Sequence, residues 1–80
     1  MSKEEIKKKV CDFLIEEFEV DASKLSNDAR LREDMGLESL DFVDIVVIVK
    51  REFGFVIAPE EMKSVNTLKE LCDFIDNKMS

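Results

Sequence analysis

The sequence has no histidine, tryptophan or tyrosine, and its 80 residues include only two glycines, one proline and two cysteines. Without an imidazole the chain cannot form a Ser–His or Cys–His nucleophile pair, or a zinc site that contains histidine. The two cysteines, Cys11 and Cys72, lie far apart and form no CxxC motif, so we expect both to pack as free thiols. Most templates for a small enzyme are therefore excluded.

Positive charge is also scarce. Twelve lysines and arginines stand against nineteen aspartates and glutamates, and the net charge of −7 repels nucleic-acid phosphate and anionic membranes. No apolar run approaches the roughly 18 residues of a membrane span, and the start, MSKEEIKKKV, lacks the apolar centre of a secretion signal. We expect a cytoplasmic protein that binds basic proteins, and neither nucleic acid nor membranes.

The length and composition favour one helical domain. A chain of 80 residues is too short for two independent cores, and an apolar content of 45% with so little glycine and proline is typical of a compact helical fold. Capping residues and apolar spacing predict helices over residues 3–19, 39–53, 59–63 and, after a cap at Thr67, to about residue 78. We expect an all-α four-helix bundle with three long helices, a short third helix and a long loop between helices one and two.

The spacing of apolar residues decides whether residues 39–53 form a helix or a strand. Residues 39–53 are rich in valine and isoleucine, which by propensity favours a strand. Strict alternation fails, however, and apolar residues recur at i, i+4, i+7 and i+11, with Ile45 beside them. This spacing predicts a helix whose core stripe consists of Phe42, Val46, Val49 and Phe53.

Residues 34–41, DMGLESLD, resemble the attachment segment of the acyl carrier proteins. The signature of that family is Asp-Ser-Leu at the entry of its second helix, preceded by an acidic residue, a large apolar residue and glycine. Here the tripeptide is Glu38-Ser39-Leu40. The resemblance covers about residues 3–78, and it implies that residues 1–80 form a single acyl-carrier domain that catalyses no reaction itself.

The resemblance implies that a phosphopantetheinyl transferase attaches 4′-phosphopantetheine from coenzyme A to Ser39, with Glu38 helping to position the transferase. Acyl groups are then carried as thioesters to the enzymes of fatty-acid or related biosynthesis. The residues alone support a phosphate at this position, because a serine at a helix start lies beside unpaired amides and the positive end of the helix dipole. The alternative is that Ser39 is only an N-cap.

Two other functions stay open. A carrier of this type can hold a polyketide or aminoacyl thioester instead of a fatty-acyl one. The chain can also be an unmodified acidic helical adaptor that binds a partner helix. Failure to accept phosphopantetheine would favour the adaptor.

A second apolar stripe on helix two is displaced from the core stripe. We interpret it as an exposed docking strip flanked by carboxylates, since members of the family present this helix to their enzymes; the alternative is that both stripes are core. The expected docking residues are Glu38, Leu40, Asp41, Val43, Asp44 and Val47. The partners implied are the transferase and acyl-processing enzymes with basic docking surfaces, and we expect the chain to be a monomer.

Two features bear on cargo and partner choice. If acyl chains are sequestered between helices two, three and four, the residues placed to line that space are Ile45, Val49, Met62, Val65 and Leu71, which are otherwise simple core residues. Glu38 replaces the family's usual aspartate, and Lys50 and Arg51 stand where its members commonly have carboxylates. Because Lys50 and Arg51 shorten the acidic face of helix two, we hypothesise a specialised set of partner enzymes.

Overall fold

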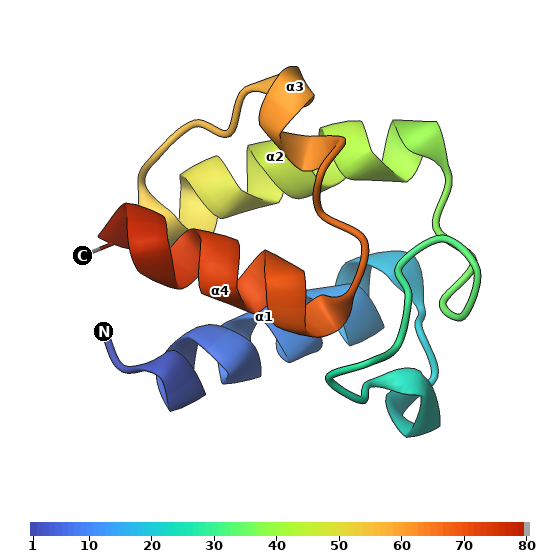
Figure 1. Ribbon diagram of the computed structural model, residues 1–80. Coiled ribbons are helices and arrows are strands. Elements are labelled where there is room, and N and C mark those ends of the chain that lie inside the picture. Colours follow the sequence, from blue (N-terminus) through green and yellow to red (C-terminus); the bar gives the residue numbers. More distant parts are fainter. Residues whose placement is uncertain (80) are drawn as a thin grey trace.

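The computed structural model describes residues 1–79, which form helices and no β-strand (Figure 1). The elements are α1 (Lys3–Phe18), a short 3₁₀ turn η1 (Ala22–Lys24), α2 (Ser39–Phe53), α3 (Pro59–Met62) and α4 (Leu68–Met79). The predicted all-α fold, with three long helices and a short third helix, is confirmed. None of these helices is long and apolar enough to cross a bilayer.

Local interactions set the helix ends. At the start of α1 the hydroxyl of Ser2 accepts from the N–H of Glu5, and the Glu5 carboxylate accepts from the N–H of Ser2, both at 3.2 Å. The first helix stops one residue before the predicted end, because Glu19 has a left-handed φ of 56°. Lys63 follows α3 as its cap, and α4 continues one residue past its predicted end, to Met79.

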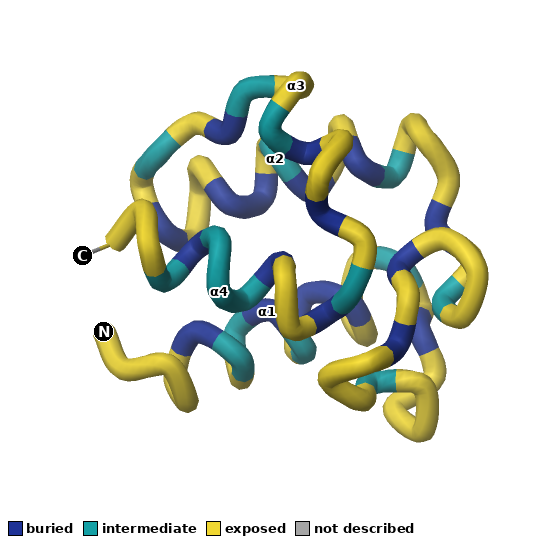
Figure 2. The backbone as a smooth tube through the Cα atoms, viewed as in Figure 1, coloured by how far each residue is buried: buried dark blue, intermediate teal, exposed yellow. Residues whose placement is uncertain are grey.

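The core lies where α1 packs against both α4 and α2, and buried segments of all four helices face one another in Figure 2. Of the stripe predicted on α2, Phe42, Val49 and Phe53 are buried as expected. The prediction for Val46 is wrong in part, since Val46 is only half-buried while Ile48 is buried in its place. The two residues lie on opposite edges of the stripe, and the single turn of α3 covers less of its edge than the long α1 covers.

The long loop between α1 and α2 is tied to the start of α4. Arg30 and Thr67 form an isolated antiparallel bridge, and the N–H of Leu31 donates to the carbonyl oxygen of Asn66 at 2.8 Å. The side chain of Leu31 is completely buried. These contacts give the loop a fixed path toward α2.

Candidate functional site

Ser39 is the first residue of α2, and its side chain is exposed. The N-cap is Glu38, which has an extended backbone, so the interpretation of Ser39 as an N-cap is wrong. The Ser39 hydroxyl has no hydrogen-bond partner anywhere in residues 1–79. A serine with this placement is available to another protein.

The first turn of α2 leaves polar groups open beside this hydroxyl. The carboxylate of Asp41 accepts from the N–H of Glu38 at 2.8 Å, which fixes the start of the helix. The N–H groups of Ser39 and Leu40 make no hydrogen bond within the described residues. Two unpaired amides and the positive end of the helix dipole therefore lie beside the Ser39 hydroxyl, where they favour an anion.

The turn before Ser39 is anchored in the core through Leu37. The side chain of Leu37 is buried, and its N–H donates to the carbonyl oxygen of Leu31 at 3.0 Å. Gly36 has a φ of +76°, a conformation that L side chains rarely adopt. Earlier in the loop, a hydrogen bond from the N–H of Arg30 at 2.7 Å holds the pKa of Asp34 below its ordinary value. The chain thus reaches Ser39 through an ordered turn.

The second stripe of α2 is exposed over its whole length. Leu40, Val43 and Val47 are 77%, 60% and 62% exposed, so the alternative that both stripes are core is wrong. Three exposed apolar side chains on one face of a helix form a candidate interaction surface. Glu38 and Asp44 are exposed, whereas Asp41 is half-buried and occupied in the helix cap.

A cavity of about 260 Å³ opens between α2 and α3, beside Ser39. Its apolar lining consists of Phe42, Val43, Val46, Pro59 and Met62. Of the residues predicted to surround an acyl chain, Met62 lines this cavity. The other four, which are Ile45, Val49, Val65 and Leu71, are buried in the core.

Two cations complete the lining of the cavity, and sequence reasoning missed both. Arg32 comes from the loop before α2, and Lys63 follows α3. The guanidinium carbon of Arg32 lies 4.6 Å from the centre of the Phe42 ring. Spacing along the sequence gave no signal for this pair, because the fold alone brings the two residues to one cavity.

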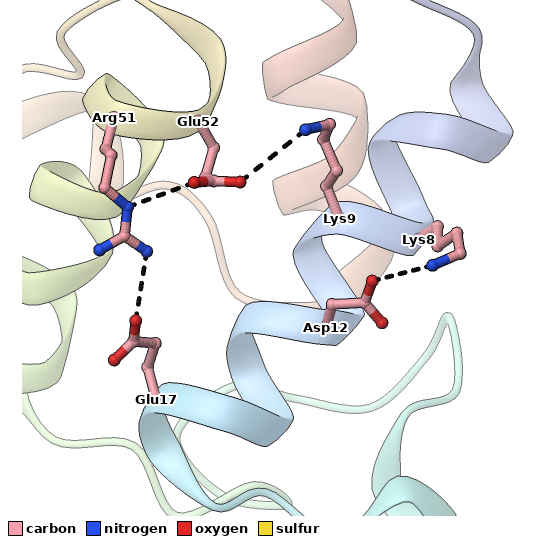
Figure 3. Close-up of polar contacts among 6 residues, drawn as sticks. All are labelled: Lys8, Lys9, Asp12, Glu17, Arg51 and Glu52. Atoms are coloured by element: carbon pink, nitrogen blue, oxygen red, sulfur yellow. Dashed lines mark hydrogen bonds and ion pairs between the residues drawn. The ribbon is translucent and has the colours of Figure 1, made fainter.

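The far half of α2 is connected to α1 by the ion pairs in Figure 3. Nη2 of Arg51 lies 3.2 Å from Oε1 of Glu17, and its Nε lies 3.2 Å from Oε2 of Glu52. Glu52 also faces Lys9, with 3.8 Å between Nζ and Oε1. The hydrogen bonds to Glu17 and Glu52 raise the pKa of Arg51 above its ordinary value. Lys50, in contrast, is exposed and makes no ion pair within residues 1–79.

Comparison with known proteins agrees with this geometry. The family described as "Phosphopantetheine attachment site" matches residues 8–75. The acyl carrier protein of Thermosynechococcus vestitus is 34% identical over 80 residues, which covers 100% of this chain and 99% of the relative. Those of Buchnera aphidicola and Thermotoga maritima are each 33% identical, over 73 residues (91% of both chains) and 78 residues (98% of this chain and 96% of the relative).

The family match defines a carrier domain that is loaded with 4′-phosphopantetheine. The chain belongs to the acyl carrier protein family, so it is a carrier and not an enzyme. Its residues fit the prosthetic group, since a free hydroxyl, two unpaired amides and a cavity meet at the start of α2. When bound, the group supplies a thiol on which acyl groups are held as thioesters. Family members act with a phosphopantetheinyl transferase and with acyl-processing enzymes.

Proposed function

We propose that Ser39 is the attachment residue and that the chain presents acyl thioesters to the enzymes of fatty-acid or related biosynthesis. The observation that supports this assignment is the exposed hydroxyl of Ser39, which is without a partner on the first residue of α2. In the transfer, the Ser39 oxygen forms the new bond to phosphorus and loses its proton, while the adenosine bisphosphate part of coenzyme A leaves. The amides of Ser39 and Leu40 stabilise the resulting phosphodiester anion.

Intact mass spectrometry tests the attachment. The purified chain is incubated with coenzyme A, magnesium and a phosphopantetheinyl transferase of broad specificity, beside the variants Ser39→Ala and Ser26→Ala. The second variant removes an exposed hydroxyl outside the helix start and serves as the matched control. We expect the wild type and Ser26→Ala to gain the mass of one arm and Ser39→Ala to gain none. A folded wild type that gains no mass would favour the adaptor.

We infer that the exposed strip of α2 is the docking surface for these enzymes. Leu40, Val43 and Val47 supply its apolar part, and Glu38, Asp41 and Asp44 are the carboxylates expected to face basic partner surfaces. The exposure of the apolar residues supports the inference, because burial against a partner would remove them from water. Glu38 stays the residue expected to help position the transferase.

A pair of truncations tests the docking surface. Val47→Ser removes apolar area from the strip, while Val56→Ser makes the same change at a valine that is 64% exposed in the segment after α2. We expect Val47→Ser to lower kcat/KM of the transferase by about 5- to 10-fold, as the loss of one buried valine implies, and Val56→Ser to leave it unchanged. Equal effects of the two variants would contradict the assignment.

The acyl chain, we propose, enters the bundle through the cavity beside Ser39. Met62 lines this cavity and is also one of the five residues expected around the chain, so it marks a path from the surface into the core. Ile45, Val49, Val65 and Leu71 lie further along that path as expected lining. Loading a long acyl chain should raise the melting temperature, whereas no change would show that the chain stays outside.

We propose a monomeric domain, residues 1–80, that works in the cytoplasm. The free state of Cys11 and Cys72 supports a reducing compartment.

A further inference from the structure

We propose that Arg32 and Lys63 bind the phosphodiester at the base of the prosthetic arm and hold it over the cavity between α2 and α3. The inference rests on the proposed attachment at Ser39. It adds two binding residues, one before α2 and one after α3, to a site otherwise built from the first turn of α2.

Arg32, Lys63 and Ser39 line the same cavity of about 260 Å³, although Lys63 lies far from the other two in the sequence. The fold brings them together because α3 lies alongside α2 in the ribbon view (Figure 1). Any group that is joined to the Ser39 oxygen therefore enters a space with two cationic side chains in its walls.

The charges of Arg32 and Lys63 are both unmatched among the described residues. Arg30, in the same loop, pairs with Glu33 at 3.7 Å and with Asp34 at 3.5 Å. Arg32 and Lys63 make no ion pair with any residue of the range 1–79. The chain has nineteen carboxylates and a net charge of −7. Two cations that stay unpaired at one cavity in such a chain form a site that attracts an anion.

The guanidinium carbon of Arg32 lies over the Phe42 ring, 4.6 Å from its centre, and Phe42 also lines the cavity. Such a cation–π contact holds the guanidinium in place without using its N–H donors. A planar donor fork of this kind matches two oxygens of a phosphate, and an ammonium such as that of Lys63 adds a point charge.

The phosphodiester is favoured over a carboxylate on the cargo. Its phosphorus is bonded directly to the Ser39 oxygen and cannot leave the neighbourhood of the two cations. The thioester lies at the opposite end of the arm. The two cations also offset the repulsion that Glu38 and Asp44, both exposed near the start of α2, exert on the added negative charge.

The test compares loading in matched variants. Wild type, Arg32→Gln, Lys63→Gln, the double variant and Lys24→Gln are prepared with and without the arm, and intact mass confirms the loading of each. Lys24 is an exposed lysine of η1 that makes no ion pair among the described residues and does not line the cavity, so it controls for the loss of one positive charge. The readouts are the melting temperature at low and high salt and the ³¹P resonance of the phosphodiester.

We expect loading to raise the melting temperature of the wild type and of Lys24→Gln by about 2–5 °C more than that of the double variant at low salt. This difference should shrink in high salt. The ³¹P resonance should move in Arg32→Gln and Lys63→Gln and keep its wild-type position in Lys24→Gln. The same melting shift and the same ³¹P position in all loaded proteins would overturn the inference while leaving Ser39 as the attachment site. Failure of the wild type to gain the arm would instead overturn the proposed function, and this inference with it.

Discussion

Arg51 on α2 reaches back to Glu17 on α1, with 3.2 Å between Nη2 and Oε1 (Figure 3). The same guanidinium contacts Glu52, so its charge is matched by two carboxylates of its own chain. Lys50, the preceding residue, makes no ion pair within residues 1–79. These two neighbouring cations of α2 therefore have different roles, since Arg51 joins two helices and Lys50 is exposed.

Replacing Arg51 by glutamine should reduce the stability of the protein slightly and leave the rates of partner enzymes unchanged. The ion pairs are largely exposed, so we expect the melting temperature to fall by a few degrees at low salt and by less at high salt. Thermal unfolding followed by circular dichroism measures the change, with Lys50→Gln as the control that should unfold like the wild type. A loss that persists in high salt would show that packing, and not charge, is the main contribution of Arg51.

Reversing the charge of Lys50 should change partner choice. Lys50→Glu extends the acidic face past Asp44, and we expect it to raise kcat/KM of fatty-acid synthesis enzymes with basic docking surfaces by about 3- to 10-fold at low salt. The measurement is a set of acyl-transfer rates over a range of ionic strength. Unchanged rates in both Lys50→Glu and the double change with Arg51→Glu would remove the hypothesis of specialised partners.

Acid should weaken the start of α4 through Glu70. Its carboxylate accepts from the N–H groups of Thr67 at 2.9 Å and Asn66 at 3.0 Å, and these bonds hold its pKa below the ordinary value of 4.5. The resulting stability is complete above pH 4.5 and is lost as the pH falls through the lower value in the folded protein. We expect Glu70→Gln to be less stable than the wild type at pH 7 and to lose less stability between neutral and acidic pH. The measurement is the melting temperature of each protein as a function of pH, and the same pH dependence in both would contradict this expectation.

The cysteines should be slow to react in the native protein. Burial raises the pKa of Cys72 from 9.0 to about 11, and burial also raises the pKa of Cys11. At pH 8 the thiolate of Cys72 is therefore about 100-fold less populated than in the unfolded chain, and alkylation should slow by a similar factor. The same shift adds stability that is present below pH 9.0 and is lost as the pH rises toward 11. Alkylation followed by mass spectrometry, native against denatured, measures the ratio, and similar rates in both states would refute it.

The helices could be predicted because local rules and packing agree. A capping box, Pro59 and the Thr67 cap each mark a helix start that the structure contains, and the helical period on α2 outweighed its strand propensity. The exchange of Val46 for Ile48 in the core could not be predicted. Which edge of α2 is covered depends on how short α3 is and where it lies, and neither is encoded in the α2 sequence itself.

The site was predicted in part for a similar reason. The sequence around Ser39 predicts it as the attachment residue, and the second stripe predicted an exposed face, which the structure contains. That Glu38 and not Ser39 caps the helix depends on the path of the loop, which leaves the hydroxyl of Ser39 without a partner. Arg32 and Lys63 have no periodic relationship to it and meet it only through tertiary structure.

The bridge between Arg30 and Thr67 has a consequence for the order of folding. Helices gain most of their contacts from neighbours in the sequence, whereas this bridge closes a long stretch of chain. The chain entropy lost on closing it is offset only when α4 packs against the rest of the domain. The turn that leads to Ser39 runs through the same loop. We expect the turn at Ser39 to reach its final conformation late, after the residues beyond Thr67 have been synthesised. Modification of Ser39 would then favour chains in which the loop and α4 are already in contact.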